Sequence, residues 1–206
     1  MIKSFFKYLM ESKERTVVAF HGKVRIPTIG HKAVIDHAKS LAKKHGGKLH
    51  INLSGADKPL SVKHKTEFAS RLFNHPVHSN PAHGSIVAYL SHLHAQGNHH
   101  LHLVAGSDRA NEYKNILSKY NGKPDKKGNV PFHFKSWKVH TVGAERVESD
   151  KHPTKMSHDE LHRTVSASKL EALAKSGDEK GFHAYHPGVD KSHVTKLYNA
   201  IRSSKE

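Results

Sequence analysis

The segment GKVRIPTIGH at residues 22–31 combines residue types that could bind a phosphate group. Gly22 lacks side-chain bulk, so a phosphate could approach the main chain there. Thr28 can donate a hydrogen bond from its hydroxyl. His31, which follows Gly30, can donate one from its imidazole and offset developing negative charge. The alternative is a plain connection between a strand and a helix, in which Thr28 only opens the helix.

A second segment, VSASK at residues 165–169, repeats this combination near the other end of the chain. Ser166 and Ser168 offer two hydroxyls beside the expected start of a helix, where free backbone N–H groups and the helix dipole favour an anion. Lys169 adds a positive charge. The alternative interpretation is an ordinary serine cap of a helix.

A third segment, GSDR at residues 106–109, carries an acceptor and a guanidinium side by side. Asp108 could accept a hydrogen bond from a ribose hydroxyl or an ammonium group, and Arg109 could bind a phosphate. The alternative is a helix cap followed by a solvated arginine.

These three segments are expected in an alternating pattern of strands and helices. Apolar, β-branched runs predict strands, and apolar residues at helical spacing predict helices. The expected strands are residues 15–20, 46–55, 100–108 and 134–142, and the expected helices are residues 30–45, 60–73, 84–96, 109–120, 166–177 and 190–204. Residues 144–163 are polar, and no regular element is expected there. This order predicts an α/β fold, a Rossmann-like, mostly parallel sheet flanked by helices, whose ligands bind at the carboxyl ends of the strands.

The composition favours an anionic partner. The chain has 206 residues and a formal net charge of +16 with histidine neutral, which attracts nucleotides, nucleic acid or an anionic surface. It has no apolar run long enough to cross a bilayer, so no membrane partner is expected. It has no cysteine, which excludes disulfides and thiolate metal sites and fits a reducing compartment. Its 22 histidines include His99, His100 and His102, but no carboxylate lies close by in the sequence and histidine is scattered along the whole chain. Solvated or compositional histidines are therefore expected rather than a metal site.

The segment AFHGKVRIPTIGH resembles the first signature of the nucleotidyltransferase superfamily, the adenylyl- and cytidylyltransferases with an HxGH motif. It is most similar to the nucleotidyltransferase-like proteins of large tailed phages, where GRFNPPTIGH is usual and Thr28 commonly replaces the first histidine. The residues in register are Gly22, Pro27, Thr28, Gly30 and His31. The segments LVAGSDR, YNGK and VGAER also resemble that family, and VSASKLEALAKSGDEKGF resembles its second signature, ISSTxxR. The resemblance covers roughly residues 16–186.

Three charged positions depart from the family pattern. Lys23 and Arg25 stand where arginine and asparagine are usual, so cationic character is kept. Glu171 stands where the second signature carries its arginine, a charge reversal at a place expected to touch the triphosphate. Arg163 and Lys169 are neighbouring cations that could substitute for the missing arginine of the signature.

The resemblance implies a reaction in which a phosphate on an acceptor attacks the α-phosphorus of a nucleoside triphosphate in line and pyrophosphate leaves. It implies ATP or CTP and a small phosphate-bearing acceptor as substrates, with Mg²⁺ bridging the triphosphate oxygens. It implies catalytic roles for His31, Thr28 and Lys23, and nucleotide-binding roles for Gly22, Gly30, Ser166, Ser168, Lys169, Asp108 and Arg109. The alternative function is a catalytically impaired relative that binds nucleotide or DNA through its basic surface.

Residues 1–14 are expected to form an N-terminal arm, and residues 15–206 a single nucleotidyltransferase-like domain. The arm contains LME at residues 9–11 and resembles the cleaved targeting peptides of internal head proteins of tailed phages. The alternative is a frayed helix that packs on the domain through Phe5, Phe6 and Leu9. The expected location is the cytoplasm, that of the host if a phage encodes the chain, or the virion head. KMSHD at residues 155–159 also resembles the KMSKS loop of class I aminoacyl-tRNA synthetases, although the chain is shorter than expected of a complete synthetase.

Overall fold

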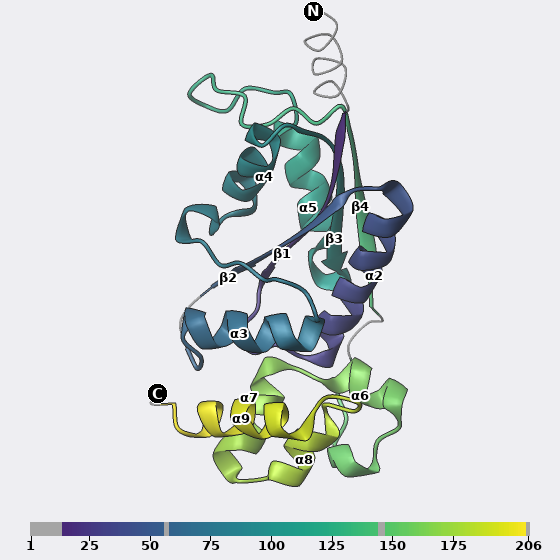
Figure 1. Ribbon diagram of the computed structural model, residues 1–206, viewed down its shortest axis with the longest axis vertical. Coiled ribbons are helices and arrows are strands. Elements are labelled where there is room, and N and C mark those ends of the chain that lie inside the picture. Colours follow the sequence, from purple (N-terminus) through teal and green to yellow (C-terminus); the bar gives the residue numbers. More distant parts are fainter. Residues whose placement is uncertain (1–13, 56–57, 144–146, 205–206) are drawn as a thin grey trace, which may run out of the picture.

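The computed structural model describes residues 14–55, 58–143 and 147–204. Its strands are β1 (Arg15–Lys23), β2 (Lys48–Ser54), β3 (Asn98–Gly106) and β4 (Ser136–Val142). They form one sheet in the order β2-β1-β3-β4, and every neighbouring pair is parallel (Figure 1). The fold is therefore α/β with a parallel sheet flanked by helices, as the sequence predicts.

Ten helical segments connect and follow the strands in the described part of the chain. The longer helices of the sheet layers are α2 (Ile29–His45), α3 (Val62–Phe73), α4 (Ile86–Ala95) and α5 (Ser107–Tyr120), and the C-terminal helices are α6 (His158–Thr164), α7 (Ala167–Ser176), α8 (Glu179–Ala184) and α9 (Lys191–Arg202). Two short 3₁₀ turns are η1 (Pro81–His83) and η2 (Pro153–Lys155). The expectation of no regular element over residues 144–163 was wrong, because α6 begins within that polar segment. No described helix is long and apolar enough to cross a membrane.

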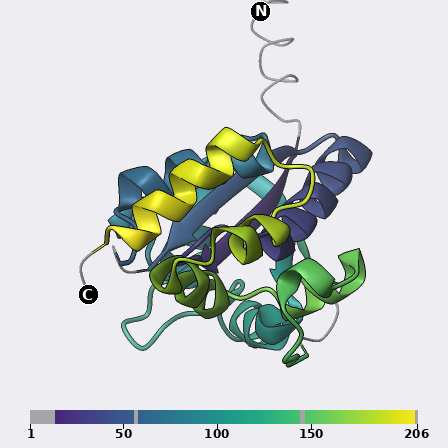
Figure 2. The same ribbon diagram turned by 90° about the horizontal axis from the view of Figure 1, so that it is seen from below.

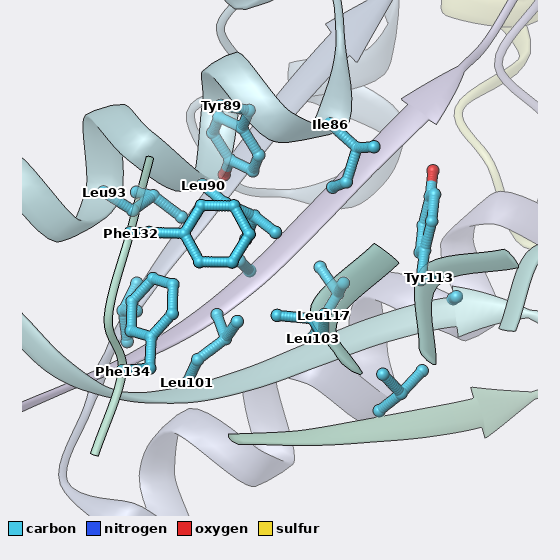
Figure 3. Close-up of a cluster of buried hydrophobic side chains, with 14 of the residues drawn as sticks. Ile86, Tyr89, Leu90, Leu93, Leu101, Leu103, Tyr113, Leu117, Phe132 and Phe134 are labelled. Atoms are coloured by element: carbon cyan, nitrogen blue, oxygen red, sulfur yellow. The ribbon is translucent and has the colours of Figure 1, made fainter. Parts of the chain in front are cut away.

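One face of the sheet is covered by α4 and α5. Successive side chains of a strand point to opposite faces, so alternate apolar residues of β1 and β3 meet these helices. The buried cluster consists of Val17, Ala19, Ile86, Tyr89, Leu90, Leu93, Leu101, Leu103, Ala105, Ala110, Tyr113, Leu117, Phe132, Phe134 and Val139 (Figure 3). Phe132 and Phe134 come from the segment before β4, so this core also holds the residues that lead into that edge strand.

The other face of the sheet is covered by α2 and α3. Its buried cluster consists of Val18, Phe20, Val24, Val34, Ile35, Ala38, Leu41, Ile51, Leu53, Ala69, Leu72, Phe73, Val77 and Val104. The four side chains from α2 recur at helical spacing, which explains why residues 29–45 form a helix with one apolar side. The helix begins directly after β1 and therefore lies with its N-terminus at the carboxyl edge of the sheet.

The C-terminal helices α6 to α9 lie across the carboxyl edge of the sheet (Figures 1 and 2). A third buried cluster joins them to the turn after β1, where Ile26 and Ile29 pack with residues of α6, α7, α8 and α9. The members from these helices and the turn before α7 are Leu161, Val165, Leu170, Ala174, Phe182, Tyr185, Val194, Leu197, Tyr198 and Ile201. Because this core includes Ile26 of the segment 22–31 and Val165 of the segment 165–169, it packs these two segments against each other.

The strand order places a switch point between β1 and β3. After β1 the chain adds β2 on one side, and it then returns to add β3 on the other side of β1. Ligands of open parallel sheets bind in the crevice that this reversal leaves at the carboxyl ends of the strands. The turn after β1 and the start of α5 after β3 both lie at that edge.

Candidate functional site

The turn after β1 ends in a reciprocal pair of hydrogen bonds between Thr28 and His31. Thr28 is the N-cap of α2, and its hydroxyl oxygen accepts the backbone N–H of His31 at 3.3 Å. The Thr28 backbone N–H in turn donates to Nδ1 of His31 at 3.2 Å, and the Thr28 hydroxyl lies 2.8 Å from the same nitrogen. The histidine thus takes the place of the glutamate of a capping box.

This arrangement sets the tautomer of His31. An amide N–H can only donate, so Nδ1 must accept, and the neutral imidazole carries its proton on Nε2. The same contacts set the ring orientation, because Thr28 is buried, with 3% of its surface exposed. The neutral His31 ring therefore has its hydrogen-bond donor at Nε2, at the N-terminus of α2.

The second segment forms the start of α7. Ser166 is the N-cap, and its hydroxyl oxygen accepts the backbone N–H of Lys169 at 3.1 Å. Its own O–H is still able to donate to a ligand. Ser168 is exposed in the first turn of the helix. Ser166 thus caps the helix, as the alternative interpretation expects. Its hydroxyl hydrogen is not used in this capping bond and can be donated to another group.

The Lys169 side chain lies in the first turn of α7, where its ammonium group forms an ion pair with an exposed carboxylate. Its Nζ atom is shielded from solvent and has no hydrogen-bond acceptor among the described residues. The nearest carboxylate is that of Glu148, 3.4 Å away, and Glu148 is 97% exposed. An ammonium group in such a position favours a nearby anion.

The two segments meet although more than a hundred residues separate them. Gly30 lies against Val165: a Cβ placed on Gly30 would stand 3.6 Å from the Val165 Cγ1 atom. A second contact joins the two parts of the chain, since the Arg25 Nη2 group donates to Glu171 Oε2 at 2.7 Å. The N-termini of α2 and α7 are therefore neighbours, with hydroxyl, imidazole, guanidinium and ammonium donors around them.

Gly22 has a packing role in this structure. A Cβ atom there would lie 2.7 Å from the Phe20 ring, so any other residue would displace that ring from the core. Lys23, which follows it at the end of β1, is exposed, and its aliphatic stem lies against Gly55 at the end of β2. Its catalytic role stays a prediction.

The third segment forms the start of α5 at the same edge of the sheet. This helix has Gly106 at its N-cap position and no capping bond from a side chain. The Asp108 carboxylate folds back over Gly106. Arg109 Nη1 donates to Glu112 Oε2 at 2.5 Å, so a phosphate would have to share the guanidinium with that carboxylate.

His21 lies beside the candidate site, and sequence reasoning did not single it out. It stands near the end of β1, directly before Gly22, and is 5% exposed. Its Nε2 lies 3.2 Å from the His83 carbonyl oxygen and its ring stacks on Tyr89, while Nδ1 has no partner among the described residues. Burial lowers its pKa. The available signal was a histidine directly after the buried apolar run of β1, near the carboxyl edge of the sheet.

The histidines of β3 are more enclosed than expected. Instead of being solvated, His99, His100 and His102 are partly buried, because β3 is an inner strand with a layer of helices on each face. His102 Nδ1 lies 2.8 Å from His140 Nε2, and the His45 ring stacks on His102. Among the described residues no three histidine, aspartate or glutamate side chains are placed to hold a metal ion.

Comparisons with known proteins give little further information. No family model and no curated protein matches the chain. Among solved structures, the chain is similar to tryptophanyl-tRNA synthetase from the hyperthermophilic archaeon Aeropyrum pernix K1, with 11% sequence identity and a TM-score of 0.39. The match covers 98% of this chain and 74% of the synthetase chain. The order and direction of the strands, and not this likeness, define the fold.

Proposed function

We propose that the chain is a nucleotidyltransferase that binds a nucleoside triphosphate between the N-termini of α2 and α7. It transfers the nucleoside monophosphate part to a small phosphate-bearing acceptor and releases pyrophosphate. The observation that carries the proposal is the meeting of these two helix N-termini at the carboxyl edge of the sheet, with Thr28, His31, Ser166 and Lys169 around them.

The chemistry of this junction suits a polyanion. Each helix N-terminus presents backbone N–H groups and the positive end of a helix dipole. The capping side chains of Thr28 and Ser166 satisfy one N–H group each, at His31 and Lys169, and leave the other first-turn N–H groups without an intrahelical partner. Two such ends with added cations match the several negative charges of a triphosphate better than a single phosphate.

The reaction needs positioning and charge stabilisation more than covalent work by the protein. An oxygen of the acceptor phosphate forms a bond to the α-phosphorus, and the bond from that phosphorus to the bridging oxygen of the β-phosphate breaks. The electron pair leaves with pyrophosphate. The Nε2–H of His31 and the Lys169 ammonium would stabilise the negative charge that builds up on the phosphate oxygens. The triphosphate would enter as its Mg²⁺ complex, with the ion held by phosphate oxygens.

The proposal is tested by an acceptor screen that measures pyrophosphate release. Phosphorylated sugars, alcohols, mononucleotides and phosphopantetheine are offered with ATP and with CTP in the presence of Mg²⁺. We expect release that depends on one acceptor class. No release with any acceptor, together with no triphosphate binding by calorimetry, would contradict the proposal.

A second candidate function is the binding of nucleotide or nucleic acid without turnover. The observation that favours it is the pairing of Arg25 with Glu171, which neutralises one cation at the junction, combined with the net charge of +16. A titration with duplex DNA over a range of salt concentrations tests it. Binding that weakens steeply with salt would support this function, since phosphate contacts release counterions. Absent or salt-independent binding would count against it.

A further inference from the structure

The ion pair of Arg25 and Glu171 joins the two halves of the proposed site. Arg25 lies in the turn after β1 and Glu171 in α7, 146 residues later, and the Arg25 Nη2 group donates to Glu171 Oε2 at 2.7 Å. Both side chains are partly exposed, at 43% and 28%. An exposed ion pair of this kind adds little to stability, typically less than about 1 kcal/mol. Stabilisation of the fold therefore does not explain why Arg25 and Glu171 are paired at this place.

The backbone on both sides of the pair is held firmly. Arg25 stands between Val24 and Ile26, which are 1% and 0% exposed, so the base of its side chain has one position. Glu171 lies three residues after Ser168 and therefore shares the side of α7 that Ser168 presents. Leu170, which is fully buried, fixes the rotation of that helix. The pair thus stands beside the N-terminus of α7 at a defined place.

The hydrogen bond leaves most of the guanidinium available. Arginine has five N–H donors in a rigid fork, and the structure gives Glu171 one of them. A guanidinium held at one nitrogen keeps a fixed orientation while its other donors can bind phosphate oxygens. The carboxylate would thus orient the cation without using up its donors.

We propose that Arg25 binds the terminal phosphates of the nucleoside triphosphate and that Glu171 is a positioning residue that holds its guanidinium toward them. This inference rests on the proposed function. It gives the carboxylate at position 171 a role in the site, although that position departs from the family pattern by a reversal of charge. A cation for the terminal phosphates then comes from the turn before α2, in addition to Lys169 of α7.

Calorimetric titrations with ATP and with AMP test the role of Arg25. Arg25→Ala should weaken ATP binding by about 10-fold or more and leave AMP binding within about 2-fold, because AMP lacks the β- and γ-phosphates. Arg25→Lys keeps the charge but loses the fork, so it should fall between the parent and Arg25→Ala. Arg202→Ala, an exposed arginine in the last turn of α9, is the matched control and should bind ATP as the parent does.

Two variants of equal charge test the role of Glu171. Glu171→Gln keeps an oxygen that can accept from Arg25, whereas Glu171→Leu does not. We expect Glu171→Leu to bind ATP about 3- to 10-fold more weakly than Glu171→Gln, which is the size of one lost hydrogen bond. In an Arg25→Ala background the two variants should bind alike, because the group they position is gone.

The outcomes separate this inference from the proposed function. If the parent binds ATP and Arg25→Ala binds it equally well, or loses ATP and AMP to the same extent, Arg25 does not hold the terminal phosphates. If Glu171→Leu and Glu171→Gln bind alike with Arg25 present, Glu171 does not position it. If the parent binds neither ATP nor CTP, the proposed function itself is wrong and the inference falls with it.

Discussion

Thr28 and His31 hold each other at the start of α2 by two opposed hydrogen bonds. The Thr28 hydroxyl oxygen accepts the His31 backbone N–H, and His31 Nδ1 accepts the Thr28 backbone N–H. The same contacts cap the helix and leave the imidazole proton on Nε2. One pair of residues thus couples the local stability of the turn to the chemistry that the proposed site needs, and substitutions can separate the two effects.

Replacement of His31 by alanine should lower kcat by about 10²–10³ while the fold stays intact, which is the typical cost of one lost charge-stabilising donor. The measurement is steady-state kinetics with the acceptor found in the screen, with a melting curve to check the fold. His64→Ala, an exposed histidine of α3, is the control and should leave kcat unchanged. A change confined to the KM of the acceptor would place His31 away from the triphosphate.

Replacement of Thr28 by valine should lower the free energy of unfolding by about 1 kcal/mol, since valine keeps the shape of threonine but cannot cap the helix. Urea denaturation measures this loss. Thr28→Ser keeps the hydroxyl and should retain most of the stability and of the activity. Equal stability of the valine and serine variants would show that the cap contributes nothing measurable.

Most of the sheet and its helices could be predicted from the sequence because their signals are local. The apolar run before Gly22 and the helical spacing after it predict β1 and α2, and the structure has both. The short helices α6 and α8 were missed, although Ser157 and Glu160 form a readable capping box at the start of α6. Seven residues in a polar segment give too little periodicity to reveal a helix.

The candidate site could be predicted only in part, because its assembly depends on contacts between distant residues. Thr28 and Ser166 were expected at helix starts, and both cap helices there. The bond between Arg25 and Glu171 spans 146 residues, and no spacing rule in one sequence indicates it. His21 is buried by a loop 62 residues away, so its environment also depends on the tertiary fold. The predicted arm lies outside the described residues, apart from Glu14.

Replacement of Lys169 by alanine should weaken ATP binding by about 10-fold or more, because a shielded ammonium beside the α7 N-terminus would lose a charged hydrogen bond to phosphate. Calorimetric titration measures the change. Lys180→Ala removes an exposed lysine from α8 and is the matched control for net charge. Equal weakening in both variants would indicate a general effect of charge and not a specific contact.

The stability of the fold should fall as the pH is lowered from about 6.5 to about 4. His186 is 3% exposed, and burial lowers its pKa from 6.5 to about 4, while its Nδ1 group bonds to the Phe182 carbonyl. Between these pH values His186 is protonated in the unfolded chain but not in the folded chain. The stability that it contributes above pH 6.5 is therefore lost as the pH falls toward 4. The shift corresponds to at most about 3 kcal/mol. Burial and the neighbouring His102 lower the pKa of His140 to about 4 as well, with the same sign.

Urea denaturation at several pH values between 7.5 and 4.5 measures this dependence. His186→Gln cannot take up a proton and should flatten the slope of unfolding free energy against pH, whatever it does to stability at neutral pH. A slope that is the same in the parent and in His186→Gln would show that His186 does not titrate differently in the folded and unfolded chains.

The most direct test of the central claim is a map of backbone amide chemical shifts during titration with ATP and Mg²⁺. In the proposed site the triphosphate lies between the N-termini of α2 and α7. We therefore expect the largest shifts on residues 28–31 and 166–169, and smaller shifts at those amides with AMP. Large shifts confined to other surfaces, or none at millimolar ATP, would contradict the claim that these two helix ends form the site.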